Sequence, residues 1–149
     1  MLATHTVLFS LALVGWPPWL ANASPQQIAP YVRSGNPDRV VVFVHGIFGS
    51  PENTWTCKNG KSWAQLLLGD SAFKGADIYL ASYPTAYVGN RTTIDEIVSH
   101  LKSRFDHDGV FSRHRQVVFL CHSMGGLVIQ RFLLTYREYA NQVPFIYFF

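Results

Sequence analysis

Ser123 lies in a segment whose residue types and order could support nucleophilic chemistry. Residues 121–126 read Cys-His-Ser-Met-Gly-Gly, after a short apolar run at 116–120 and before helix-forming residues at 127–131. A strand, a sharp turn, a serine and a helix in this order predict a nucleophile elbow, which exposes the serine hydroxyl at the carboxyl end of a sheet. Such a hydroxyl attacks carbonyl carbon, while the next amide and the helix amino terminus stabilise the oxyanion that forms.

The turn around Ser123 should leave little room for side chains. An elbow needs small residues two places before and two places after the serine, because the strand and helix backbones almost touch. Gly125 meets the second requirement, and Cys121 takes the first place, where the pattern has glycine. Cysteine is small and compatible with burial. The alternative is a chance Ser-x-Gly turn, and the flanking strand and helix argue against it.

A second glycine-bearing loop predicts the other half of an oxyanion site. His45-Gly46-Ile47-Phe48-Gly49 follows the apolar run 40–44. A loop of this kind can present a backbone amide to a developing oxyanion. Two loops far apart in the chain therefore predict one site.

The elements around these loops alternate between strand and helix. The sequence predicts strands at 40–44, 76–82, 116–120 and 143–149, with helices at 62–68 and from 124 to about 139. A further helix begins at a capping box of Thr93 and Glu96. Its apolar stripe comprises Ile94, Ile97, Val98, Leu101 and Phe105. This alternation predicts an α/β fold with a parallel sheet.

Composition excludes several classes of protein. Of 149 residues, 48% are hydrophobic and 14% are charged, which excludes intrinsic disorder. The net charge of +3 comes from scattered basic residues, so no nucleic-acid partner is expected. Two cysteines form neither a disulfide framework nor a zinc motif. No metal or organic cofactor is therefore implied.

Both ends of the chain carry expectations of their own. Residues 1–23 have the pattern of a signal peptide, with an apolar run at 7–14 and the cleavage site Ala21-Asn22-Ala23, which predicts export to the periplasm or medium. A wrongly placed start codon or a membrane-proximal tail is the alternative, and the protein would then be cytoplasmic. A lead-in segment at 24–38 precedes a domain at 39–149. The apolar run 144–149 ends in mid-strand, so we expect the amino-terminal part of a longer protein.

The two motifs resemble the α/β-hydrolase family, in its lipase and esterase branch. The resemblance rests on Val-Phe-Val-His-Gly-Ile-Phe-Gly at 42–49 and Val-Phe-Leu-Cys-His-Ser-Met-Gly-Gly-Leu-Val-Ile at 118–129. The His-Ser-Met-Gly-Gly-Leu-Val form of the second motif is similar to that of lipase-like members such as inositol deacylases of glycolipid anchors. The resemblance implies the first part of a three-layer sandwich with a mostly parallel sheet. It implies Ser123 as nucleophile and the backbone amides of Ile47 and Met124 as oxyanion donors, with motif support from His45, Gly46, Gly49, His122, Gly125 and Gly126.

The family order of nucleophile, acid and histidine is incomplete in this sequence. After Ser123 the chain has one acid, Glu138, and no histidine. Glu138 is expected to face solvent on the helix after the elbow. Neither His45 nor His122 can be assigned as the base. The acid and the histidine are expected beyond Phe149.

These patterns predict a serine hydrolase that cleaves a carboxylic ester, lipid or thioester through an acyl-enzyme on Ser123, inactive as this fragment. Its partner is a small-molecule or lipid ester, and a lipid would bring contact with a membrane surface. The alternatives are a catalytically dead binding module and a non-functional truncated product. Three aromatic residues could line an acyl pocket or pack in the core: Trp55, Trp63 and Tyr83. Cys57 is expected to be a free loop thiol, and residues 113–115 a solvated turn.

Overall fold

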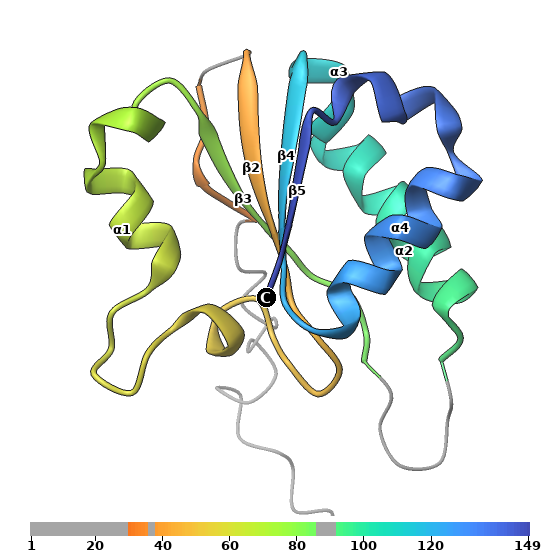
Figure 1. Cartoon of the computed structure of the whole chain (residues 1–149), viewed down its shortest axis with the longest axis horizontal. Coiled ribbons are helices and arrows are strands. Elements are labelled where there is room, and N and C mark those ends of the chain that lie inside the picture. Colours follow the sequence, from red (N-terminus) through yellow and green to blue (C-terminus); the bar gives the residue numbers. More distant parts are fainter. Residues whose placement is uncertain (1–29, 36–37, 86–91) are drawn as a thin grey trace, which may run out of the picture.

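The chain folds as a five-stranded sheet with helices on both faces (Figure 1). The computed structural model describes residues 30–35, 38–85 and 92–149. The strand order is β1-β3-β2-β4-β5, and all neighbours pair in parallel except β1 and β3. The expected fold class is confirmed. The strands are β1 (Tyr31–Arg33), β2 (Arg39–Val44), β3 (Asp77–Ala81), β4 (Gln116–Cys121) and β5 (Phe145–Phe148).

Strand β2 is the centre of the sheet and is covered on both faces. Val40, Val42 and Val44 belong to the core beneath the helices on one face, and Val41 and Phe43 belong to the core on the other. Side chains alternate along a strand, so a run with no polar residue fits only a strand with two covered faces. Val44 is paired with Ala81 on one side and Cys121 on the other. The loops after β2 and β4 therefore start at the same edge of the sheet.

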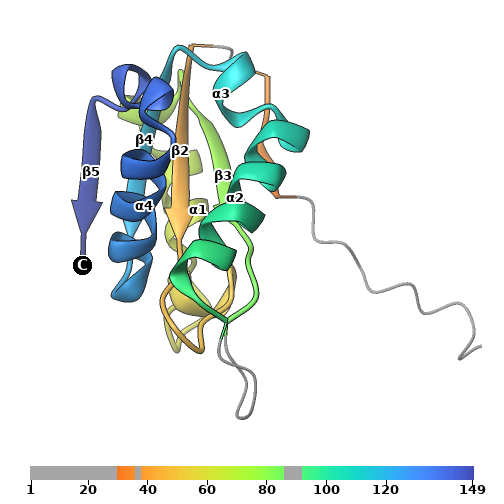
Figure 2. The ribbon, with the colours of Figure 1, turned by 90° about the vertical axis from the view of Figure 1, so that its right-hand side faces the viewer.

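The helices form one layer on each face. Figure 1 places α1 (Trp63–Gly69) on one side of the sheet, with α2 (Ile94–Asp108) and α4 (Met124–Thr135) on the other. Figure 2 shows α2 and α4 side by side. Short elements complete the chain: α3 (Val110–Arg113) and the 3-10 helices Asn53–Trp55, Ser71–Phe73 and Arg137–Gln142. The helix predicted to reach residue 139 thus ends at Thr135. In the described residues no helix is long and apolar enough to cross a membrane.

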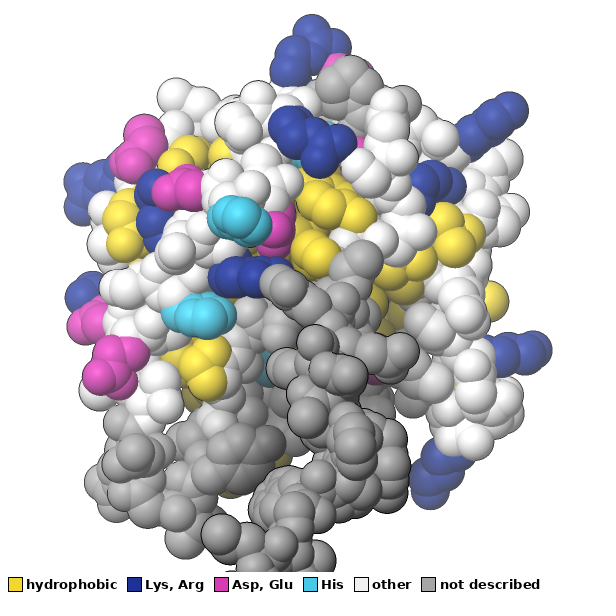
Figure 3. Space-filling view, turned by 180° about the vertical axis from the view of Figure 1, so that it is seen from behind, with side chains coloured by type: hydrophobic (Ala, Val, Ile, Leu, Met, Phe, Trp, Pro, Cys, Tyr) yellow, Lys and Arg dark blue, Asp and Glu magenta, His cyan; other side chains and the backbone are white. Residues whose placement is uncertain are grey.

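Helix α2 begins as its sequence predicts. The Thr93 hydroxyl accepts from the Glu96 amide, and the Glu96 carboxylate accepts from the Thr93 amide, which completes the capping box. The predicted stripe is buried from Ile97 onward, whereas Ile94 is 37% exposed. On its outer face, acidic and basic side chains pair four residues apart, as in Lys102 with Asp106. The face in Figure 3 accordingly shows both signs of charge interspersed.

The segment expected as a lead-in contributes a strand. Within it, β1 pairs antiparallel with β3, and the Leu80 amide donates to the Pro30 carbonyl at 2.7 Å. The Arg33 side chain holds the same edge, because its Nε donates to the Ala76 carbonyl at 2.8 Å. The sequence does not predict this strand, because three residues are too few for an alternating apolar pattern to distinguish a strand from a loop. The sheet is therefore mixed at this edge.

The turn at 113–115 was wrongly expected to be solvated throughout, because His114 is only 2% exposed. Its Nε2 lies 3.0 Å from Asp77 Oδ2, and its Nδ1 donates to the Val110 carbonyl at 2.8 Å. Asp77 begins β3 and is also buried. This pair joins α3 to the sheet at the end away from the elbow, since buried polar groups need partners.

We expect Asp77→Ala to lower the free energy of unfolding by about 1–3 kcal/mol, because the buried His114 ring would lose its hydrogen-bond partner at Nε2. Asp38→Ala is the control: it removes a carboxylate that pairs with Arg115 at the surface. An exposed pair of this kind contributes less than about 1 kcal/mol. Urea denaturation of both variants measures the difference. Equal losses would contradict the role of the buried pair.

Candidate active site

Ser123 adopts the strained backbone of a nucleophile elbow. Its φ is 53° and its ψ is −128°, and it immediately precedes α4, with only His122 between it and the end of β4. Only Ser123 and Phe48 have positive φ among the described residues other than glycine. The side chain is exposed to solvent. A backbone in this region costs energy and persists only where its surroundings hold it.

Hydrogen bonds on both sides of Ser123 hold this conformation. The His122 amide donates to the Val44 carbonyl at 2.9 Å, which fixes the turn to the end of β2. The Gly126 amide donates to the Ser123 carbonyl at 3.0 Å, and the Ser123 amide donates to the Phe149 carbonyl at 3.0 Å. The backbone of the turn is therefore tied to β2, to α4 and to the end of β5, while the hydroxyl stays available.

Glycines allow the close approach of α4 to the sheet. A Cβ on Gly125 would lie 2.5 Å from the His45 carbonyl oxygen and 2.8 Å from that of Val44. Both neighbours are backbone atoms and cannot turn away. Cys121 is fully buried at the position where the motif has its first glycine. Burial raises the pKa of its thiol to about 12, so Cys121 is not a competing nucleophile at neutral pH.

The loop after β2 reaches the elbow from the other side. The Gly49 amide donates to the Gly46 carbonyl at 3.2 Å and closes a β-turn. A Cβ on Gly46 would lie 3.0 Å from Ser123 Cβ, so the two loops are in direct contact. Within the described part of the chain, neither the Ile47 amide nor the Met124 amide has a hydrogen-bond partner. Two free N–H groups beside a serine can stabilise an oxyanion.

His45 fixes the loop after β2 to the core. The ring is 1% exposed, and its Nδ1 donates to the Gly46 carbonyl at 3.0 Å. It stacks on the Tyr83 ring at 4.1 Å between centroids, and the Tyr83 hydroxyl donates to the His45 carbonyl. Burial lowers the pKa of His45, so the ring is neutral at neutral pH. Tyr83 is 5% exposed, which favours core packing over a pocket wall.

Ser123 has no hydrogen bond to a histidine in residues 30–35, 38–85 and 92–149. His122 is exposed, and its ring lies 6.2 Å from that of Trp55. Glu138 is exposed on the 3-10 helix after α4. The structure thus brings Ser123 and the loop that carries Ile47 together, and in the described region no histidine contacts Ser123.

Aromatic residues surround the elbow on the α1 side. Trp55 is 4% exposed and packs edge to face on Phe43 at 5.0 Å, which makes it part of the core. Trp63 is 37% exposed and meets Phe149 at 5.2 Å. Cys57 is an exposed free thiol in the loop between them. The sequence left the roles of both tryptophans open, and burial separates them.

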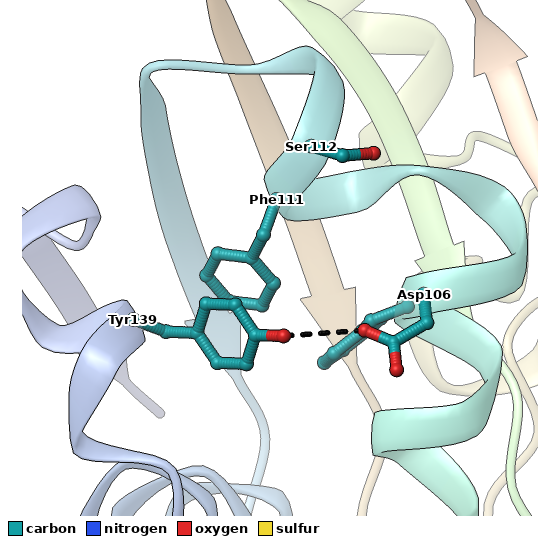
Figure 4. A pocket seen from close by; sticks show the side chains of 5 residues that line it. Asp106, Phe111, Ser112 and Tyr139 are labelled. Atoms are coloured by element: carbon teal, nitrogen blue, oxygen red, sulfur yellow. Dashed lines mark hydrogen bonds between the residues drawn. The ribbon is translucent and has the colours of Figure 1, made fainter.

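The cavity in Figure 4 is separate from this site. It has a volume of about 290 Å³ and is lined by Phe105, Asp106, Phe111, Ser112 and Tyr139. The Tyr139 hydroxyl donates to Asp106 Oδ1 at 3.2 Å across it. None of its lining residues belongs to the elbow or to the loop after β2.

Comparisons with known proteins found a matching family model and a similar solved structure. Residues 41–146 match a family model described as the alpha/beta hydrolase family. One similar solved structure is an extracellular alpha/beta-hydrolase from a Paenibacillus species, whose title states homology to tobacco salicylic acid binding protein 2. It is 18% identical, with a TM-score of 0.49 over 74% of this chain. The chain spans 39% of that protein's length. No curated protein matches the chain.

The close approach at Gly125 can be tested by adding one methyl group. We expect Gly125→Ala to lower the free energy of unfolding by about 1–3 kcal/mol, because the new Cβ would overlap backbone oxygens. Gly69→Ala is the matched control, since a Cβ there meets nothing within 4 Å. It should be neutral or stabilise by up to about 1 kcal/mol. Thermal unfolding measures both variants, and a Gly125→Ala protein as stable as the parent would refute the packing described.

Proposed function

Because the chain belongs to the alpha/beta hydrolase family, we propose that Ser123 is the nucleophile of a serine hydrolase that cleaves carboxylic ester or thioester bonds. The observation that carries the proposal is the strained, exposed Ser123 at the start of α4, beside the unpartnered amides of Ile47 and Met124. A serine hydroxyl held in this way has the geometry for attack on a carbonyl carbon.

The proposed reaction proceeds through an acyl-enzyme. Ser123 Oγ attacks the carbonyl carbon and gives its proton to a general base. The carbonyl oxygen becomes an oxyanion and accepts hydrogen bonds from the Ile47 and Met124 amides. The alcohol or thiol then leaves with a proton, and water releases the acid by the same steps in reverse. The proposal places the base outside the described contacts of Ser123.

A second candidate is a catalytically inactive member that binds esters or carboxylates. The observation that favours it is that Ser123 contacts no histidine in the described residues. A serine without a base still presents two amide donors and an exposed hydroxyl. The two candidates differ in whether Ser123 reacts with an electrophile.

Labelling of the protein from its native source separates them. We expect a fluorophosphonate probe to modify Ser123, because the probe reacts with an activated serine and its tetrahedral adduct uses the oxyanion amides. Tryptic mapping by mass spectrometry locates the adduct. Ser123→Ala should abolish labelling, and Ser112→Ala, a matched exposed serine on α3, should leave it unchanged. Labelling that persists in Ser123→Ala would rule out the assignment.

We also propose that the protein is exported. The proposal rests on the apolar run at 7–14 and on Ala21-Asn22-Ala23, which lie outside the described residues. We expect intact-mass analysis of protein from the native host to give an amino terminus at Ser24, because signal peptidase cleaves after small residues at this spacing. An uncleaved chain found only in the cytoplasm would contradict export.

A further inference from the structure

Phe48 combines two unfavourable features. Its φ is 58°, in the left-handed region, and its side chain is 77% exposed. A large side chain with positive φ is a strained conformation. The only other such non-glycine residue in the described parts of the chain is Ser123 itself.

The turn that contains Phe48 makes its identity unusual. The hydrogen bond from the Gly49 amide to the Gly46 carbonyl places Phe48 third in a four-residue turn. Positive φ at the third position alone is the pattern of a type II turn, which favours glycine or asparagine there. Glycine would form the same turn without strain. The turn therefore does not explain the phenylalanine.

Packing does not explain it either. In the described region the Phe48 ring contacts no other aromatic ring, and three quarters of the side chain faces solvent. The next residue back, Ile47, is also 45% exposed. Its amide is one of the two proposed oxyanion donors, so an ester carbonyl held there lies beside Phe48. A second apolar surface flanks the elbow, where Phe149 meets Trp63.

We propose that Phe48 is a specificity-determining residue whose ring binds the apolar alkyl or aryl group of the ester attacked by Ser123. This rests on the proposed function for the position of the ester. The strained turn leaves the ring exposed beside the Ile47 amide, where a bound substrate would cover it. Binding then removes the exposed apolar surface from water, which favours esters with large apolar groups over acetate esters.

Equilibrium binding in the Ser123→Ala protein tests the proposal without catalysis. Octanoate represents the acyl side of the ester and 1-octanol the alcohol side, with acetate and ethanol as short homologues, and NMR titration gives each Kd. We expect Phe48→Ala to weaken octanoate or 1-octanol about tenfold and to leave the short homologues unchanged. Leu134→Ala is the control, because Leu134 is also an exposed apolar side chain, at 62%. It lies on α4 near the start of α2 and not on the loop that carries Phe48. Whichever long ligand responds identifies the side of the ester that Phe48 contacts.

Phe48→Gly supplies a second readout that a structural role would not produce. Glycine relieves the positive φ, so the midpoint of thermal unfolding should hold or rise while long-chain affinity falls. Equal affinities for both long ligands in the Phe48→Ala and parent proteins would overturn the proposal, and so would a fall in the unfolding midpoint of Phe48→Gly. Phe48-dependent binding without fluorophosphonate labelling of Ser123 would refute the hydrolase and retain the apolar subsite.

Discussion

The contact between the start of α4 and the end of β2 is the constraint on which the site depends. Gly125 lies so close to the His45 and Val44 carbonyls that no side chain fits between them. This approach forces the chain to pass from β4 to α4 through only two residues, His122 and Ser123, and Ser123 takes a positive φ as a result. The parallel register supports it, since Val44 and Cys121 end their strands side by side. The strain at Ser123 is thus a consequence of packing between backbones.

The same contact connects Ser123 to the loop after β2, which carries the proposed oxyanion donor Ile47. The His45 carbonyl that faces Gly125 also accepts a hydrogen bond from Tyr83, at the end of β3. The neutral ring of His45 holds the Gly46 carbonyl from within the core. Oxyanion donors are effective when they are fixed before the charge develops. Three adjacent strands therefore fix the position of the Ile47 amide relative to Ser123.

The sequence predicts those features that depend on local residue types. The run at 40–44 identifies β2 because only a strand with two covered faces tolerates five apolar residues in succession, and Thr93 with Glu96 marks the start of α2 to the residue. The nucleophile motif is likewise local. The burial of His114 escapes prediction because its partner, Asp77, is 37 residues away and its neighbours are arginines. The contact of His45 with Tyr83 also escapes prediction, because the two residues are far apart in the sequence. The positive φ of Phe48 escapes prediction because a sequence motif does not encode backbone angles.

Side-chain size around Ser123 follows what each position contacts. At Gly125, where backbone meets backbone, even one methyl group would overlap a carbonyl oxygen, and at Gly46 a methyl group would press on Ser123 Cβ at 3.0 Å. Where the loop faces solvent, the chain carries Ile47 and Phe48, although glycine would suit the turn at Phe48 better. The strained non-glycine positions of the described chain are thus Ser123, the proposed nucleophile, and Phe48, which follows the proposed oxyanion donor Ile47. Positive φ at non-glycine residues, confined in the described chain to two loops in contact, fits selection for binding at this edge of the sheet, because stability alone would favour glycine at the second position.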